Sequence, residues 1–316
     1  MKDHTIFKNP IFIMLSATFA CFLWGSAFPS LKFSYNALNL SDAPFYYKLQ
    51  FASYRFLLAS SMIFVFIFIT KINLKITFKN LKHLFILGLI QTGFQYLFFY
   101  IGLSNTTAIK GAIMISVGTF FSIVLPHFYY NDDKMSTRKI VGLVVGFSGV
   151  VLINLSKGPL DSSFSIFGEG FLIVAALMGA IASIMAKELT KNIHPVAITG
   201  YQMLLGSIVM LLISFGFTGG NVIEFNLSVL PIFIHLGFIS AAGFCIWFTL
   251  LKYNKVSTIS IYKFQIPIWG SILAAIFIPE ERINLITVLS LGLVSLGIII
   301  VNLKKKNKND VDLNSN

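Results

Sequence analysis

The sequence predicts an all-α integral membrane protein with ten transmembrane helices, arranged as two inverted five-helix repeats. Three observations lead to this fold class: the composition, a series of apolar runs, and an internal similarity at a fixed shift. Of the 316 residues, 56% are hydrophobic and only 11% are charged, whereas soluble domains carry about 25% charged residues. A water-soluble core of this size could not bury so many apolar side chains, so lipid must be part of the solvent.

A membrane-spanning helix needs about 20 predominantly apolar residues. Eight runs free of Asp, Glu, Lys and Arg fit this requirement, two of them short but flanked by charge: 11–31, 84–109, 111–131, 140–156, 170–186, 195–223, 225–251 and 283–303. Two further runs carry one internal cation each, Arg55 in residues 49–70 and Lys263 in residues 256–278. The chain therefore has ten predicted spans.

The first run follows Lys2 and Lys8 and could be mistaken for a signal peptide. It is longer than a typical signal-peptide apolar region, and nine more runs follow, so we expect it to be retained as a helix. The predicted connections are all under about 20 residues, which leaves no room for a soluble domain. The polar tail, residues 304–316, is expected to be disordered.

The lysines and arginines of the predicted loops and tails fall mostly on one side of the membrane. If the N-terminus is cytoplasmic, seventeen lie inside, namely Lys2, Lys8, Lys71, Lys75, Lys79, Lys82, Lys134, Arg138, Lys139, Lys187, Lys191, Lys252, Lys255, Lys304, Lys305, Lys306 and Lys308. Five lie outside, namely Lys32, Lys48, Lys110, Lys157 and Arg282. Cytoplasmic loops carry an excess of Lys and Arg. We therefore expect a protein of the bacterial cell (plasma) membrane with both termini in the cytoplasm. This distribution also accounts for the net charge of +12, so we expect no nucleic-acid partner.

A shift of 148 residues aligns 99–155 with 247–303 without a gap, although identities are few. The segment 132–134, Asp-Asp-Lys, then falls opposite 280–282, Glu-Glu-Arg, each between two apolar runs. This pattern predicts two five-helix units, residues 1–156 and 165–303. A unit with an odd number of spans enters the membrane from the opposite side the second time, which gives the inverted repeats of many secondary transporters.

Several short segments, in this order, resemble the EamA-type members of the drug/metabolite transporter superfamily. They are Leu23-Trp24-Gly25-Ser26-Ala27-Phe28, Tyr54-Arg55-Phe56-Leu57-Leu58-Ala59, Tyr100-Ile101-Gly102-Leu103 with Thr106-Thr107-Ala108, the glycines Gly142, Gly146 and Gly149, and Pro267 followed by Glu281-Arg282. One departure is Thr119 at the position equivalent to Pro267. The resemblance covers about residues 11–303. It implies ten helices in two EamA-like repeats and the export or uptake of small metabolites.

Arg55 and Lys263 are the clearest candidates for substrate contact. A cation inside a membrane span is costly and usually faces a cavity, a partner or the interface. Lys263 would lie about two turns from the cytoplasmic end of its helix. There it could hold a carboxylate or phosphate, or repel cations. Snorkelling to the interface, or structural pairing, is the alternative for both residues.

Polar and aromatic residues inside the spans are the next candidates. Gln91 and Gln95 are four residues apart and so share a helix face, with Tyr96 one step round. In lipid such groups need partners, so this stripe should point inward. The remaining predicted substrate-binding residues are Tyr201, Trp247, Trp24 and Gln265. Hydrogen bonding between helices is the alternative role for each of them.

The acidic residues all lie in tails, loops or helix ends. Proton-driven carriers often use a buried carboxylate, so we expect facilitated diffusion or exchange, with His235 and His127 as weak proton candidates. Cys21 and Cys245 have no disulfide or metal-site spacing. We expect no cofactor and no metal.

The sequence therefore predicts a secondary transporter, an exporter of a small polar metabolite such as an amino acid, that works by alternating access. Its partners would be the small-molecule substrate and the lipid bilayer, with a homodimer left open. A membrane channel and a membrane-embedded enzyme are the alternatives. The sequence contains no HExxH or GxSxG motif for an enzyme and no filter-like segment for a channel.

Overall fold

The computed structural model describes residues 6–74, 76–106, 108–155, 164–278, 283 and 285–303. Within these residues, ten helices are long and apolar enough to cross a membrane. Seven are unbroken or nearly so: α1 (Pro10–Ala37), α2 (Phe45–Thr70), α5 (Ala108–Tyr129), α6 (Thr137–Leu155), α8 (Pro195–Thr218), α9 (Leu230–Tyr253) and α12 (Leu285–Asn302). A short 3₁₀ turn, η1 (Ile6–Lys8), precedes α1. The predicted all-α fold with ten spans is confirmed.

The other three spans contain a change of helix type. The third consists of α3 (Phe78–Gly88), the π-helical η2 (Leu89–Phe94) and α4 (Gln95–Ser104). The sixth begins with the π-helical η3 (Ile166–Gly170) and continues as α7 (Phe171–Leu189). The ninth consists of α10 (Val256–Ser260), the 3₁₀-helical η4 (Ile261–Phe264) and α11 (Gln265–Phe277). Such breaks in helical hydrogen bonding are frequent at functional sites.

Two helix ends differ from the predicted runs for identifiable reasons. The third span begins at Phe78, not at residue 84, with the Thr77 hydroxyl accepting a hydrogen bond from Asn80 N at 3.3 Å. Lys79 and Lys82 lie in its first turns, where long cations can reach the membrane surface. The seventh span ends at Thr218 because Gly219 adopts φ +71°, the left-handed conformation that ends many helices.

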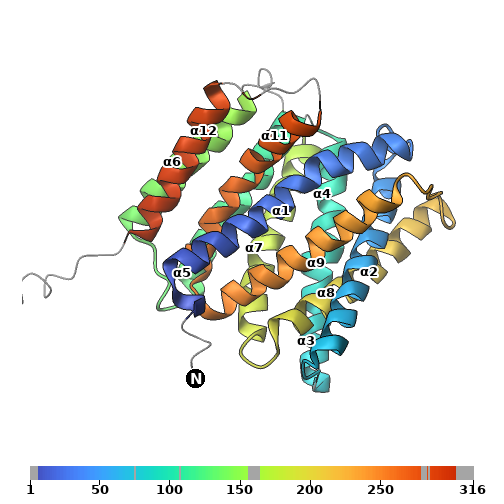
Figure 1. The fold of residues 1–316 in the computed structure, drawn as a ribbon, viewed down its shortest axis with the longest axis horizontal. Coiled ribbons are helices and arrows are strands. Elements are labelled where there is room, and N and C mark those ends of the chain that lie inside the picture. The colour runs from blue at the N-terminus through green and yellow to red at the C-terminus, as the bar shows by residue number, and fades with distance from the viewer. Residues whose placement is uncertain are drawn as a thin grey trace, which may run out of the picture.

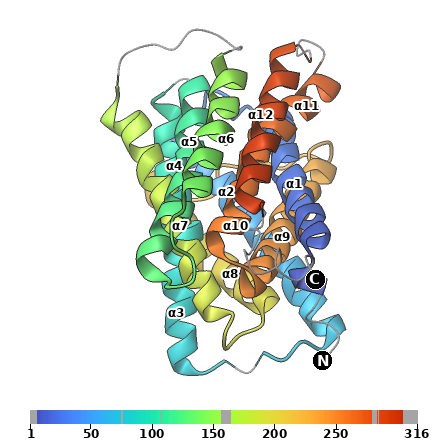
Figure 2. The same cartoon turned by 90° about the vertical axis from the view of Figure 1, so that its left-hand side faces the viewer.

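The two halves of the chain pack with opposite orientations. Helix α2 runs antiparallel to α8. Two hydrogen bonds show this orientation: Ser60 Oγ donates to Gly200 O at 3.0 Å, and Ser214 Oγ donates to Tyr46 O at 2.9 Å. Helix α6 likewise runs antiparallel to α12, and Arg138 Nη1 donates to Leu303 O at 2.8 Å. Figures 1 and 2 show α6 and α12 side by side at one edge of the molecule.

The remaining contacts follow the same exchange of spans. The fourth span, α5, packs on the sixth, α7, and the ninth, α11, packs on the first, α1. The fourth span corresponds to the ninth in the other half, and the sixth corresponds to the first. The two contacts are therefore equivalent in the two halves. This pattern is that of two inverted five-helix repeats.

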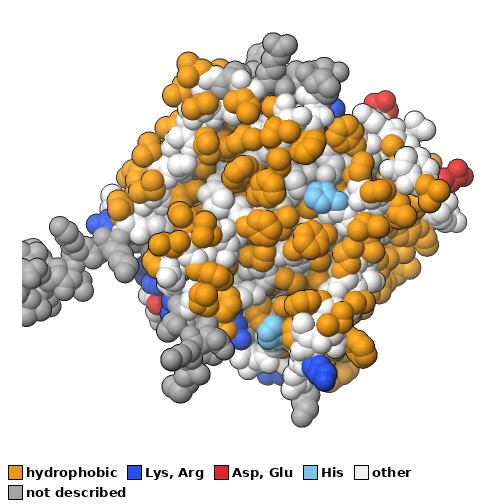
Figure 3. All heavy atoms as spheres, in the orientation of Figure 1, with side chains coloured by type: hydrophobic (Ala, Val, Ile, Leu, Met, Phe, Trp, Pro, Cys, Tyr) orange, Lys and Arg blue, Asp and Glu red, His pale blue; other side chains and the backbone are white. Residues whose placement is uncertain are grey.

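Two ends of the bundle serve as references below. The Asp133 end is where α5 and α7 finish and α6 and α10 begin, and the Glu169 end is where α2, α5 and η3 begin. Between them, the face seen in Figure 3 is covered mostly by hydrophobic side chains. Exposed hydrophobic side chains on the spans include Phe19 on α1 and Ile234 on α9. Such a surface is suited to lipid.

Parts of the sequence-based predictions lie outside the described residues. They are the Glu280-Glu281-Arg282 segment opposite Asp132-Asp133-Lys134 and the tail 304–316.

Candidate substrate cavity

A cavity of about 280 Å³ lies in the middle of the bundle, between the two halves of the chain. The first half contributes α1, α2, η2, α4 and α5, and the second contributes α7, α9, η4 and α11. The lining extends from Lys263 and Ser183 in mid-bundle to Tyr100 and Leu172 near the Glu169 end. Its volume is close to the lower limit of ligand pockets, about 300 Å³, so one small metabolite fills it.

Arg55 reaches this cavity from α2. Its side chain is buried, at 5% exposure, so it does not snorkel to the surface. The guanidinium carbon lies 4.4 Å from the centre of the Phe56 ring and 5.8 Å from that of Tyr96. These cation–π contacts contribute about 0.5–2 kcal/mol, whereas removing an ion from water costs several kcal/mol. The rings therefore offset only part of the cost of burying Arg55.

Lys263 reaches the cavity from the opposite half of the chain. It lies in η4, the 3₁₀ turn at which the ninth span changes helix type, and its Nζ is 5.1 Å from the centre of the Trp247 ring. Among the described residues, no carboxylate forms an ion pair with Arg55 or Lys263. Both cations thus rely on aromatic faces for compensation within the protein.

Two tryptophans meet in the wall of the cavity. The rings of Trp24 on α1 and Trp247 on α9 have centres 5.2 Å apart. A Cβ added to Gly243 would lie 2.7 Å from Trp24 Nε1, so the glycine makes room for this indole. Neither indole N–H has a hydrogen-bond partner among the described residues, although both nitrogens are buried.

The third span contributes an amide and aromatic face. Gln91 Nε2 donates to Gln95 Oε1 at 2.8 Å, across the end of the π-helical turn. Gly179 on α7 faces this pair, since a Cβ there would lie 3.1 Å from either amide atom of Gln95. Tyr96 packs edge-on against Phe56, with ring centres 4.6 Å apart. The two glutamines therefore satisfy each other in part, as the shared helix face predicted.

The lining combines donors and hydroxyl groups with apolar rings and methyl groups. None of the described lining residues is acidic. Its hydroxyl residues are Tyr96, Tyr100, Ser116, Thr119, Ser122, Ser183 and Ser240. Besides the two indoles, Arg55 Nε and Ser122 Oγ are buried without a hydrogen-bond partner in the described part of the chain. Buried polar atoms are normally paired, so the cavity holds unused donor capacity next to two positive charges.

Seven of the nine predicted site residues line this cavity: Trp24, Arg55, Gln91, Gln95, Tyr96, Trp247 and Lys263. The other two lie elsewhere. Tyr201 packs edge-on against Phe64, at 5.1 Å between ring centres, and Gln265 Oε1 accepts a hydrogen bond from Trp269 Nε1 at 3.4 Å. Whether the seven contact substrate stays a prediction.

The hydroxyl residues of α5 were not predicted, although the sequence contains a signal for them. Ser116, Thr119 and Ser122 recur every three residues, a spacing that keeps them near one helix face. Gly118, which lies between Ser116 and Ser122 in sequence, packs on Ala176 of α7 and so brings this part of α5 against the second half of the chain. This spacing, together with the requirement that polar groups in lipid face inward, would have placed them on the cavity.

The two histidines considered as proton carriers lie away from the cavity lining. His235 is on the exposed face of α9, with Nε2 3.5 Å from Ser26 Oγ. His127 Nδ1 accepts a hydrogen bond from Met135 N at 3.0 Å and so orders the turn after α5. Within the described residues, no group of three His, Cys, Asp or Glu side chains could hold a metal ion.

Known proteins similar to this chain are transporters. The profile of the EamA-like transporter family matches residues 11–155 and 166–303. This chain belongs to the EamA-like transporter family. An uncharacterized transporter from Archaeoglobus fulgidus is 28% identical over 298 residues, which cover 93% of this chain and 98% of the relative. The uncharacterized transporter YoaV of Bacillus subtilis is 26% identical over 259 residues, covering 81% of this chain and 85% of YoaV.

A solved structure, described only as the crystal structure of a protein, has the same fold. Its TM-score is 0.74 at 14% identity, and the match covers 93% of this chain and 98% of that one. At this identity the likeness concerns the fold alone. The family and the relatives make this EamA-type protein a non-enzymatic transporter, which excludes the membrane enzyme.

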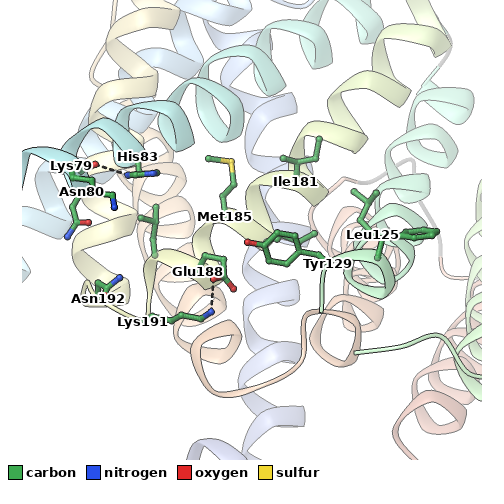
Figure 4. Close-up of a pocket in the computed structure, with 13 residues that line it drawn as sticks. Lys79, Asn80, His83, Leu125, Tyr129, Ile181, Met185, Glu188, Lys191 and Asn192 are labelled. Atoms are coloured by element: carbon green, nitrogen blue, oxygen red, sulfur yellow. Dashed lines mark hydrogen bonds and ion pairs between the residues drawn. The ribbon is translucent and has the colours of Figure 1, made fainter. Parts of the chain in front are cut away.

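A second cavity in this transporter, of about 830 Å³, lies at the Asp133 end between α3, α5 and α7. Figure 4 shows His83 beside Lys79, and Glu188 beside Lys191. His83 Nδ1 is 2.7 Å from Lys79 O, and Lys191 Nζ is 2.6 Å from Glu188 Oε2. Because Glu188 and Lys191 already pair with each other and the cavity lies at the end of the bundle, it is the weaker candidate for substrate.

The Asp133 end itself is closed by a hydrogen-bonded cluster, called here the Asp133 cluster: Asp133, Lys139 and Ser257. Asp133 is 1% exposed and accepts hydrogen bonds from Lys139 Nζ at 2.6 Å, from Ser257 N at 3.1 Å and from Ser257 Oγ. Burial alone would raise the pKa of Asp133, but the hydrogen bonds from Lys139 and Ser257 outweigh it and hold this pKa below its usual value. The cluster joins the turn after α5 to the start of α10.

Proposed function

We propose that this protein is a secondary transporter that exports a small polar metabolite, such as an amino acid or a related compound, by alternating access. The observation that carries this proposal is the position of the cavity. Both inverted halves contribute to one chamber in the middle of the bundle, whose largely apolar walls carry a few charged and polar side chains. Rocking one half against the other would open such a chamber to each side in turn.

The different construction of the two ends supports alternating access. At the Asp133 end, the Asp133 cluster and the bond from Lys187 Nζ to Asn254 O tie together α5, α6, α7, α9 and α10. Toward the Glu169 end, the cavity lining continues as far as Tyr100 and Leu172. In alternating access, the Asp133 cluster would part when the opposite end closes.

Charge supports an orientation with the Asp133 end in the cytoplasm of the plasma membrane. The described cations at that end are Lys8, Lys71, Lys79, Lys82, Lys134, Arg138, Lys139, Lys187, Lys191, Lys252 and Lys255. The cations of the described segments near the Glu169 end, apart from those within the cavity, are Lys32, Lys48 and Lys110. Lys and Arg are concentrated in cytoplasmic loops, so both termini would face the cytoplasm.

The charge of the cavity favours facilitated diffusion or exchange over proton coupling. A proton-coupled carrier usually titrates a carboxylate or histidine in its transport path, and the described lining has neither. Uptake into proteoliposomes should therefore be insensitive to a protonophore. A rate that follows an imposed pH gradient would overturn this point.

Counterflow in proteoliposomes tests the carrier proposal directly. A metabolite that stabilises the purified protein in a thermal-shift screen would be loaded unlabelled, and entry of the labelled compound followed. A carrier accumulates label transiently against its gradient, because each outward passage resets the site for an inward one. A channel gives only equilibration, and that result would reject alternating access.

A further inference from the structure

We infer that the central cavity is selective for an organic carboxylate with a compact apolar or aromatic body, and that it discriminates against an ammonium group on the same body. This inference rests on the proposed transport function and narrows its substrate class. Of the amino acids and related compounds that the proposed function allows, the carboxylic acid without an ammonium group would then be the better substrate, and the matching amino acid the poorer one.

The buried charge of the cavity is positive. Arg55 and Lys263 line the cavity from different halves of the protein, and none of the described lining residues is acidic. Intramembrane cations usually pair with an anion or face a water-filled cavity. A bound carboxylate supplies that anion, whereas a bound ammonium adds a further positive charge.

Three of the unpaired polar atoms around the cavity are hydrogen-bond donors. Trp24 Nε1, Trp247 Nε1 and Arg55 Nε are buried and lack a partner among the described residues. Indole and guanidinium nitrogens donate hydrogen bonds and cannot accept them. They lie within the cavity walls, so a rotation of their side chains would have to open them to the cavity. The group that would then satisfy them is an acceptor, and a carboxylate offers two oxygens with about four lone-pair positions.

An ammonium group in the cavity would find hydroxyl and amide oxygens that accept hydrogen bonds but carry no negative charge. The groups that offset its charge in proteins are carboxylates and the faces of aromatic rings. The Trp247 ring already lies 5.1 Å from Lys263 Nζ, and the Phe56 ring lies 4.4 Å from the Arg55 guanidinium. Gln91 and Gln95 are hydrogen-bonded to each other. An ammonium would thus compete with the protein's own cations for the same ring faces.

The walls indicate the body of the ligand. Rings from three helices line the chamber, namely Phe28 on α1, Phe99 on α4, and Phe244 and Phe248 on α9. Phe244 packs against Trp24 at 5.2 Å and against Phe248 at 5.9 Å between ring centres. These surfaces suit a flat apolar group, while the two cations and two indole N–H groups fix its charged end.

Three probes with a common phenyl body separate the possibilities: 3-phenylpropionate, phenylalanine and 2-phenylethylamine. Binding to the full chain in lipid nanodiscs is followed by tryptophan fluorescence, which is informative because two of the three tryptophans, Trp24 and Trp247, line the cavity. We expect 3-phenylpropionate to bind at least tenfold more tightly than phenylalanine, and 2-phenylethylamine to bind most weakly. Equal or tighter binding of phenylalanine or the amine, or no binding of 3-phenylpropionate at millimolar concentration, would overturn the inference.

Two variants assign the effect to the cavity. Lys263→Met removes the charge but retains an unbranched side chain. This variant should bind 3-phenylpropionate at least tenfold more weakly than wild type and should show a smaller preference for 3-phenylpropionate over phenylalanine. Trp24→Phe keeps a ring but removes one N–H donor, and should weaken the carboxylate about threefold to tenfold. The matched control is Lys191→Met, which removes an exposed lysine at the Asp133 end and should leave binding unchanged. An unchanged preference in correctly folded Lys263→Met, checked by circular dichroism, would overturn the assignment to Lys263.

Counterflow with the same probes separates this inference from the transport proposal. If 3-phenylpropionate binds but shows no counterflow, the ligand class stands and the carrier proposal fails. If phenylalanine shows counterflow and 3-phenylpropionate does not, the carrier proposal stands and the inference fails.

Discussion

The central cavity and the Asp133 cluster both contain buried polar groups, but they satisfy them in opposite ways. In the cluster, the Asp133 carboxylate accepts bonds from Lys139 and from both the backbone and the hydroxyl of Ser257. In the cavity, two indole N–H groups and Arg55 Nε have no partner among the described residues. Since an unpaired buried polar group costs about 1–3 kcal/mol, the cavity is the region that sacrifices stability. The difference separates a structural polar site from one arranged for a ligand.

Removal of the cavity lysine should reduce transport more strongly than any other substitution considered for the two regions. Lys263→Ala removes one of the two charges proposed to hold substrate. Losing a buried charge from a binding site typically costs 2–5 kcal/mol, so counterflow should fall at least about 30-fold. The protein should still fold, because Lys263 forms no ion pair with a described residue. A rate equal to that of wild type in proteoliposomes would remove Lys263 from the site.

The next largest effect is a loss of stability when the Asp133 cluster is disrupted. Asp133→Asn leaves the Lys139 ammonium, which is mostly buried, without its counter-charge. Leaving such a group unsatisfied should lower the free energy of unfolding by about 1–3 kcal/mol, measured as a lower melting temperature in detergent.

The matched control for that substitution is Lys191→Gln, which breaks the exposed pair with Glu188. The Lys191 and Glu188 side chains are 62% and 28% exposed. Such surface ion pairs contribute about 0–1 kcal/mol to the free energy of unfolding. Equal destabilisation by the two substitutions would contradict the distinction between a buried and an exposed ion pair.

A smaller effect concerns pH and again involves Asp133. Its pKa is held below the usual value in the folded protein, so its contribution to stability is complete above the unfolded-state pKa, about 3.9. The contribution is lost as the pH falls through the lower, folded-state pKa. Wild type should therefore lose more stability than Asp133→Asn between pH 5 and pH 3. Parallel melting curves over this range would argue against a depressed pKa.

The smallest expected effect is that of a polar aromatic residue outside the cavity. Tyr201→Phe should leave counterflow within about twofold of wild type, because Tyr201 packs against Phe64 and does not line the chamber. Substitutions away from special features usually change free energies by less than about 0.5 kcal/mol. A large loss of transport would mean that α8 enters the substrate path.

Sequence reasoning was most successful where the physical constraint is local. A span must satisfy its own backbone hydrogen bonds in lipid, so apolar runs located all ten helices even though their ends shifted by several residues. It was less successful in distinguishing polar residues that line the cavity from those that do not, when both have similar neighbours in the sequence. Tyr96 and Tyr201 both lie within apolar helices, yet only Tyr96 lines the cavity. Gln91 and Gln95 face it, whereas Gln265 bonds to Trp269 one turn later.

The number of spans, the uneven distribution of cations and the two intramembrane cations can all be read from the amino-acid order, because each follows from how single residues partition between water and lipid. The packing of the helices is what brings Arg55 and Lys263, from opposite halves of the chain, to one chamber. The walls of that chamber include close helix contacts at glycines, such as Gly243 against Trp24 and Gly179 against Gln95. Such contacts join residues far apart in sequence, and hydropathy carries no information about which helix faces will pack together.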